Sequence, residues 1–333
     1  MGGSDFLKVS KVVKAEKNRE IEYTVEAGTV TITSDGRKIR TIPRWKFGSF
    51  AELLLERMME HPGKGAFGIP EMETFLDDLD LETLKSASNC KTDISVMALN
   101  AINEKSLMRF SVKSELGGKP TLLNASNATR MEFAVEGLPQ ERIGEINAIE
   151  GNSKIKRRIQ AIYGYKGHLV PRGAVHPVFR RNLGMVDSRF DELISAMMLC
   201  HYLNDKSSAK IPEDKKPYLV RNLVEQVKRD RPVAGMDPDS YEYHVKLFLT
   251  HAALGMRAEE PWNEKEETDG GFINVEKDGS LHVIPLQNRD ELMAFLYEGT
   301  RLDTPAGDRT DNGRLVVEGN ELLIRLTLQI RFA

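Results

Sequence analysis

Two apolar, strand-like runs between residues 91 and 133 constrain the fold of this chain most. Asp93 stands at the start of the first run, and Ser111, Val112 and Lys113 lie within the second. Side chains alternate between the faces of a strand, so Ser111 and Lys113 point the same way. If the two runs pair as neighbouring strands, Asp93 can lie beside Lys113. An acid, a lysine and nearby carbonyls can hold a divalent cation and activate a water.

A turn of Gly-Gly-Lys-Pro at residues 117–120 follows the second run, and residues 124–130 form a polar segment. This segment is rich in short hydrogen-bonding side chains, as contacts to phosphates or base edges require. The simpler interpretation is a hairpin of a soluble domain with ordinary surface Asp and Lys. The D…SxK pattern alone favours that simpler interpretation, because Asp and Lys on strands are common.

Composition excludes several classes of protein. The chain of 333 residues is long enough for one large domain or two ordinary ones. Its net charge of −3 does not indicate a general affinity for nucleic acid. A nucleic-acid partner would therefore need a local basic cleft. Cys90 and Cys200 form no CxxC motif, which argues against zinc and disulfides and fits a reducing cytoplasm. No apolar signal core and no apolar run of membrane-spanning length is present, so we expect no membrane partner.

The order of patterns along the chain predicts an α/β fold with a mixed central sheet flanked by helices. Residues 21–43 alternate in polarity around a hairpin turn at Ser34-Asp35-Gly36. Ser49 can cap a helix over residues 49–61. Further helical patterns cover residues 71–85, 182–202, 218–230 and 240–256, and strand patterns return in residues 271–286 and 314–332.

Four segments follow from this order: an N-terminal β-rich segment (1–45), a core (46–150), a mainly helical region (151–260) and a C-terminal β-rich segment that packs on the core (261–333).

Two groups of charged side chains have both a structural and a functional interpretation. Glu52, Glu56 and Glu60 line one face of the first helix, where carboxylates are usually solvated. One of them could instead supply a second carboxylate to a metal. The densest basic cluster consists of Lys154, Lys156, Arg157 and Arg158. It is either a solvated helix face or a set of phosphate contacts.

The run FSVKSELGGKPTLLNAS, residues 110–126, resembles the core of the HpaII-type restriction endonucleases, which carry a variant of the PD-(D/E)XK nuclease site. Near the C-terminus Thr304, Pro305, Arg309 and Gly313 match a similar segment of that family, and the chain closes on a similar LQIRF strand. Residues 182–190 also resemble the family. The match of residues 110–126 is specific to this family, and the other two matches support the same resemblance.

The resemblance implies a metal-dependent nuclease site. Asp93 would bind Mg²⁺ directly, the Val112 carbonyl would add a second oxygen, and Lys113 would orient or help deprotonate the attacking water. Ser111 stands where many relatives have Glu, so the second acid must come from elsewhere. Glu52, Glu56 and Glu115 are the candidates, and Glu52 is the one assigned as a metal ligand.

The activity implied is that of a type II site-specific deoxyribonuclease that cuts double-stranded DNA at a short palindrome, CCGG. A palindrome is cut most simply by a homodimer, and a cognate DNA methyltransferase is expected in the same cell. Residues 46–150 would then be the nuclease core, and residues 151–260 the region for DNA binding and dimerisation. Two alternatives stay open: a nuclease of the same superfamily with another target, such as modified DNA, and an inactive DNA-binding module.

The expected DNA contacts lie after each strand-like run, in the basic cluster and near the C-terminus. Arg130 and Arg309 are the candidates for guanine contacts, because arginine matches the guanine edge in the major groove. The whole set comprises Lys91, Ser114, Lys119, Asn124, Ser126, Asn127, Thr129, Arg130, Arg157, Arg158 and Arg309.

Overall fold

The computed structural model describes residues 8–16, 19–60, 69–81, 92–99, 105–116, 118–204, 216, 218–305 and 312–333. The chain divides into two compact units. The first unit comprises Met1–Pro120 and Glu266–Leu292, and the second comprises Thr121–Lys265 and Met293–Ala333. These units divide the chain by compactness, whereas the four predicted segments divide it by expected role, and residues 46–150 contribute to both units.

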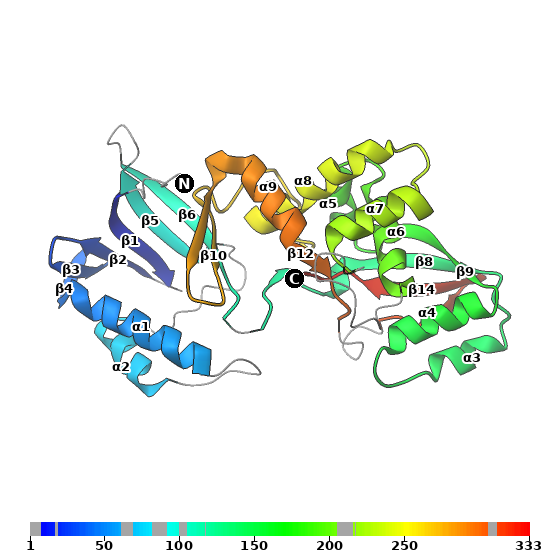
Figure 1. Cartoon of the computed structure of the whole chain (residues 1–333), viewed down its shortest axis with the longest axis horizontal. Coiled ribbons are helices and arrows are strands. Elements are labelled where there is room, and N and C mark those ends of the chain that lie inside the picture. The colour runs from blue at the N-terminus through cyan, green and yellow to red at the C-terminus, as the bar shows by residue number, and fades with distance from the viewer. Residues whose placement is uncertain are drawn as a thin grey trace. The chain divides into compact units, whose positions relative to one another are not determined.

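The first unit is built on an eight-stranded mixed sheet with the order β11-β10-β6-β5-β1-β2-β3-β4 (Figure 1). All neighbours pair antiparallel except β6 and β10, which are parallel. The strands are β1 Lys8–Glu16, β2 Arg19–Val25, β3 Thr29–Ser34, β4 Arg37–Pro43, β5 Ile94–Leu99, β6 Lys105–Ser114, β10 Gly271–Val275 and β11 Leu281–Pro285. The predicted large mixed sheet is therefore confirmed.

Local sequence explains the first hairpins of this sheet. The predicted turn between β3 and β4 is confirmed: Asp35 and Gly36 have φ of 47° and 77°, the left-handed conformation that a two-residue hairpin turn needs. Ile21 and Ile32 alternate with polar neighbours and are fully buried, so one face of β2 and β3 forms a core.

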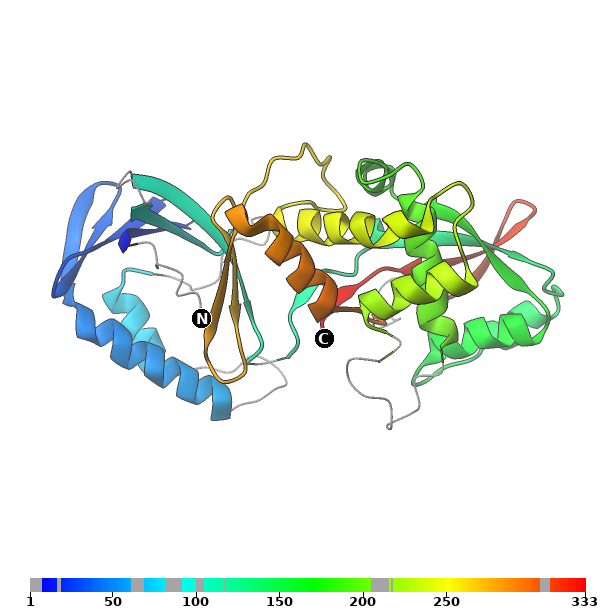
Figure 2. The same ribbon diagram turned by 45° about the horizontal axis from the view of Figure 1, so that its top comes forward.

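Two helices cover that core face, α1 Arg44–Glu60 and α2 Pro70–Asp78 (Figures 1 and 2). Phe47, Phe50 and Leu54 of α1 pack against the core of β2–β4. The expected helix start at Ser49 is wrong, since α1 begins at Arg44. The apolar contact of Phe47 with the core extends the helix by one turn before Ser49, which therefore lies inside it.

The second unit contains two smaller antiparallel sheets, of order β13-β14-β8-β9 and β12-β15-β7. Their strands are β7 Thr121–Leu123, β8 Arg130–Glu136, β9 His168–Ala174, β12 Thr300–Leu302, β13 Leu315–Glu318, β14 Glu321–Thr327 and β15 Ile330–Phe332. The helices are α3 Arg142–Asn147, α4 Lys154–Gly164, α5 Pro177–Gly184, α6 Phe190–Leu203, α7 Val220–Asp230 and α8 Tyr241–Leu254. Helix α9, Arg289–Gly299, begins in the first unit and ends in the second.

Helix α6 is the centre of the second unit, because it is buried on nearly every side and contacts α4, α5, α7 and β9. The helix predicted in residues 182–202 is confirmed as α6, which begins at Phe190, but the residues before it belong to a separate helix, α5, which ends at Gly184. The Asp187 carboxylate accepts the Arg189 backbone N–H at 2.8 Å and stabilises the turn between them.

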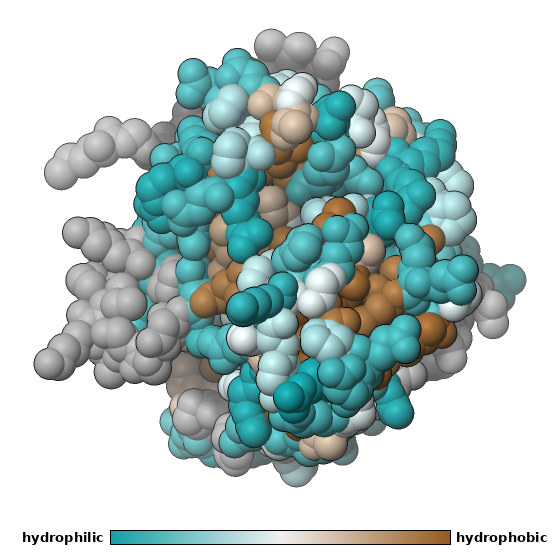
Figure 3. Space-filling model, turned by 90° about the vertical axis from the view of Figure 1, so that its right-hand side faces the viewer, coloured by the Kyte–Doolittle hydropathy of each residue, from teal (hydrophilic) through white to brown (hydrophobic). Residues whose placement is uncertain are grey.

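One face of the second unit is mainly hydrophilic. Figure 3 views the end of this unit that carries α4 and β9, where hydrophilic residues surround a smaller group of hydrophobic ones. No helix in the described part of the chain is long and apolar enough to span a membrane.

Candidate active site

The pairing of β5 with β6 places Asp93 beside the Ser-Val-Lys run in the first unit. Ile94 pairs with Phe110, so Asp93 lies opposite Ser111. The Asp93 backbone N–H also donates to the Phe110 carbonyl at 2.9 Å. The two apolar runs are therefore neighbouring strands, as the sequence predicts.

Backbone and side-chain donors of β6 fix the Asp93 carboxylate. Asp93 Oδ2 accepts a hydrogen bond of 2.7 Å from the Val112 backbone N–H and one of 3.4 Å from Ser111 Oγ. Ser111 is fully buried, so its hydroxyl faces protein rather than solvent. Ser111 thus stands where it can orient Asp93.

Lys113 follows on the same face of β6. Its Nζ lies 3.9 Å from Asp93 Oδ2 and donates to the Val112 carbonyl at 3.3 Å. Burial lowers the pKa of the Lys113 ammonium below its usual value, and the nearby Asp93 carboxylate opposes part of this shift. A lysine in this state gives up a proton more readily than a surface lysine, which suits proton transfer to or from a bound water.

Two further polar residues, Glu115 and Asn274, share this face. Glu115 lies two residues after Lys113, directly after the end of β6, and Asn274 of β10 is the parallel register partner of Lys113. Asn274 Nδ2 donates to Glu115 Oε1 at 3.0 Å, and Lys119 Nζ pairs with Glu115 Oε2 at 3.4 Å. Asn274 is not among the residues predicted from the sequence, although an asparagine between Ile273 and Val275 in an apolar strand was a signal.

The segment before β10 docks this strand against β6. The Gly270 backbone N–H donates to the Arg109 carbonyl at 2.7 Å, and Arg109 Nη1 pairs with Asp269 Oδ2 at 2.6 Å. Gly271 has φ of 124°, and a Cβ there would lie 2.2 Å from the Ile284 carbonyl oxygen. Only glycine fits at this close approach.

The assigned metal ligand Glu52 is not brought to Asp93 and Lys113. Glu52 is exposed on α1, whose apolar residues pack on the face of the sheet that carries Val96, Met108 and Phe110. Ser111 and Lys113 alternate with Phe110 and so belong to the opposite face. Among the residues that the structure describes, no three His, Cys, Asp or Glu side chains gather to hold a metal.

The expected DNA contacts that follow Lys113 in the sequence have different surroundings. Ser114 Oγ accepts the Leu116 backbone N–H at 3.3 Å, and Lys119 pairs with Glu115. Asn124 and Asn127 are exposed in the second unit. Lys91 and Arg309 lie outside the described residues.

A short 3₁₀ turn, η1 Asn127–Thr129, organises the segment after β7. Ser126 Oγ accepts the Ala128 backbone N–H at 3.2 Å, and Thr129 Oγ1 accepts the Ser126 backbone N–H at 3.1 Å. These reciprocal bonds form a capping box, and Thr129 is buried. Arg130 follows at the start of β8. The turn therefore holds the exposed Asn127 in one place.

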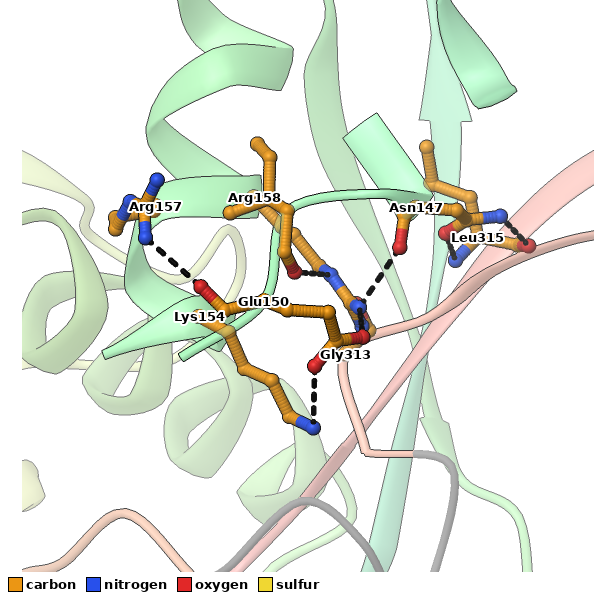
Figure 4. A network of polar contacts seen from close by, with 8 residues as sticks. Asn147, Glu150, Lys154, Arg157, Arg158, Gly313 and Leu315 are labelled. Carbon is orange, nitrogen blue, oxygen red and sulfur yellow. Dashed lines mark hydrogen bonds and ion pairs between the residues drawn. The ribbon is translucent and has the colours of Figure 1, made fainter. Parts of the chain in front are cut away.

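The basic cluster of α4 contains one buried arginine, Arg158, and one exposed arginine, Arg157. Figure 4 shows the contacts of both. Arg158 is 4% exposed. Its guanidinium donates to the carbonyls of Ile149, Gly313 and Asn147 at 3.1, 3.2 and 2.9 Å, and to Glu150 Oε1 at 2.9 Å. Arg157 is exposed, and its Nη1 donates to the Glu150 carbonyl at 3.0 Å. Arg157 is therefore better placed than Arg158 to meet a partner.

Comparison with known proteins gives the class to which this fold and site belong. The family profile described as HpaII restriction endonuclease matches residues 2–332. The chain belongs to this family, so it is a restriction endonuclease-type nuclease with DNA as the substrate class.

A particular relative supports this placement. The type II restriction enzyme HpaII of Haemophilus parainfluenzae is 30% identical over 330 residues, which cover 97% of this chain and 88% of that enzyme. No solved structure is significantly similar to the chain. The large mixed sheet flanked by helices is consistent with a restriction-endonuclease-like fold.

Proposed function

We propose that this protein is a type II restriction endonuclease that hydrolyses phosphodiester bonds of double-stranded DNA with Mg²⁺. The observation that carries the proposal is the position of Lys113 Nζ, 3.9 Å from Asp93 Oδ2 and 3.3 Å from the Val112 carbonyl, in a chain of a nuclease family. Asp93, Ser111 and Lys113 are the proposed catalytic residues.

The donor atoms at this point suit a hard cation. Asp93 offers a carboxylate and Val112 a carbonyl, and both are oxygen ligands of the kind that Mg²⁺ prefers. When bound, the metal would polarise the scissile phosphate and stabilise its developing negative charge. Glu115 is the acid that lies on the same face as Lys113, whereas Glu52, the acid assigned from the sequence, lies on α1 at the other face of the sheet.

The protein groups have separate tasks in this proposal. Val112 N–H and Ser111 Oγ hold the Asp93 carboxylate in one orientation. Lys113 orients the attacking water and takes or shares its proton, which its lowered pKa favours. A protonated Lys113 would also offset negative charge on the phosphate.

The proposed target is the palindrome CCGG, read by a homodimer in the cytoplasm of a cell that also holds a cognate methyltransferase. The family membership supports this target, and two-fold symmetry matches a palindrome. Arg130 and Arg309 are the proposed guanine contacts, with Asn124, Ser126 and Asn127 in support. The exposed Arg157 is the proposed phosphate contact of α4.

A plasmid digestion tests the activity and the target together. We expect cleavage with Mg²⁺ and none with EDTA, and sequenced ends that all map to CCGG. Ends that share another motif, or that require modified DNA, would refute the target and keep the nuclease. Binding without cleavage at any Mg²⁺ or Mn²⁺ concentration would refute the nuclease.

A further inference from the structure

Asn274 has a buried side-chain amide beside the proposed catalytic lysine. Of its two polar atoms, only the nitrogen has a hydrogen-bond partner among the described residues. The residue is 2% exposed and pairs in register with Lys113. Register partners on neighbouring strands lie about 4.8 Å apart, so the two side chains are adjacent on the same face.

The two ends of this amide have different surroundings. Nδ2 donates to Glu115 Oε1 at 3.0 Å, whereas no described residue donates to the buried Oδ1. A carboxylate only accepts hydrogen bonds, so the nitrogen must face Glu115 and the oxygen must face away. Lys119 pairs with the other carboxylate oxygen at 3.4 Å and restrains Glu115. A buried acceptor without a donor is costly, which points to a group that binds there during function.

Lys113 needs such an acceptor if the proposed function holds. In the structure its ammonium donates to the Val112 carbonyl, which is also a proposed metal ligand. The Lys113 ammonium lies 3.3 Å from that carbonyl oxygen. A metal ion bound to the same oxygen would repel the ammonium, and the Lys113 side chain would have to turn away. The Asn274 oxygen is the acceptor on the partner strand.

We propose that Asn274 is a positioning residue, whose Oδ1 accepts a hydrogen bond from the Lys113 ammonium when the metal site is filled, while Glu115 fixes the orientation of the amide. This inference rests on the proposed function. In this proposal Asn274 contacts neither the metal nor the phosphate, and it acts only through Lys113.

Substitution of Asn274 by Leu tests the acceptor, because leucine has a similar size and no polar atoms. At saturating DNA we expect the single-turnover cleavage rate to fall roughly 10- to 100-fold, as for the loss of a hydrogen bond to a charged group. The affinity for DNA in Ca²⁺ and the affinity for Ca²⁺ in the DNA complex, measured by calorimetry, should match wild type. A strong loss of Ca²⁺ affinity would make Asn274 a ligand and overturn the inference.

The variant Asn274→Asp separates positioning from simple packing. It keeps an oxygen that can face Lys113, so it should cleave DNA faster than Asn274→Leu, although it also sets a second carboxylate beside Glu115. If Asn274→Asp is as slow as Asn274→Leu while both have the wild-type melting temperature, the inference fails.

Two controls keep the outcomes distinct. Asn182→Leu removes another buried amide, whose Nδ2 donates to the carbonyls of Arg257 and Glu260, and it should lower stability without changing the rate of the folded enzyme. Lys113→Ala reports on the proposed function itself. An inactive Lys113→Ala with a fully active Asn274→Leu refutes only this inference, whereas an active Lys113→Ala refutes the proposed function.

Discussion

Lys113 in the first unit is a half-buried cation and Arg158 in the second is a buried one, and each lies next to a carboxylate, yet their surroundings differ. Arg158 donates to four protein acceptors within 3.2 Å. Lys113 has one acceptor at 3.3 Å and a carboxylate at 3.9 Å, and burial lowers its pKa. A cation with most of its donors bound to protein acceptors stabilises a fold, whereas one with most of its donors unused can act on a substrate. The following substitutions test this contrast.

The largest expected effect is that of Lys113→Ala on cleavage. Loss of the group that handles the proton of the attacking water should slow the reaction by roughly 100- to 10,000-fold. Specific DNA binding in Ca²⁺ should persist, because Lys113 is not a proposed base contact. Nicking assays and gel shifts measure the two properties. Lys277→Ala, in the exposed turn between β10 and β11, is the matched control and should cut normally.

Asp93→Asn should come next, because an amide oxygen binds Mg²⁺ far less well than a carboxylate. The Asn oxygen can still accept the Val112 N–H, so we expect little change in melting temperature. Calorimetry with Ca²⁺ or Mn²⁺ in the presence of DNA should detect the loss of a metal site. Unaltered metal binding would assign the ion to another residue.

Arg158→Ala should destabilise the protein without a specific effect on chemistry. It leaves three backbone carbonyls without their donor and removes one of the two donors of the Glu150 carboxylate, which we expect to cost about 2–4 kcal/mol of the free energy of unfolding. Urea denaturation measures this value, and a loss below about 0.5 kcal/mol, the usual size for a surface substitution, would show that the network is dispensable.

Arg157→Ala provides the smallest effect and the sharpest contrast with its neighbour. Stability should change by less than about 0.5 kcal/mol, since the side chain is exposed. DNA affinity should fall for all sequences alike, and the salt dependence should weaken by about one counterion. Arg229→Ala removes another exposed arginine, which pairs with Asp230, and should leave both properties unchanged. An equal loss in both variants would argue against a contact by Arg157.

The sequence predicted those parts of the site that depend on short-range pattern. Asp93 and Lys113 lie on runs close enough to pair as a hairpin, so strand alternation was sufficient to place them together. The position of Asn274 beside Lys113 could not be predicted, because the two residues are far apart in the chain. The sequences of two parallel strands do not determine their register. The start of α1 was missed because packing of the partly buried Phe47 against the core outweighed the local capping signal of Ser49.

Arg158, in contrast, could have been distinguished from Arg157 by helical periodicity. Ile155, Ile159 and Ile162 are buried and define the inner face of α4. Arg158 lies three residues after Ile155 and falls on that face, while Arg157 falls outside it. Arg157 and Arg158 were grouped in one basic cluster because they are adjacent in the sequence. The helical period places them on different faces of α4.

The parallel partner of β6 has a consequence for the order of synthesis. Strand β10 belongs to the first unit but is encoded after residues 121–265, which belong to the second. A nascent chain that ends before Glu266 contains Asp93, Ser111 and Lys113, but its β6 is an unpaired edge without Asn274. The ribosome must therefore complete most of the second unit before the sheet around Lys113 can close, so premature chains lack a finished nuclease sheet.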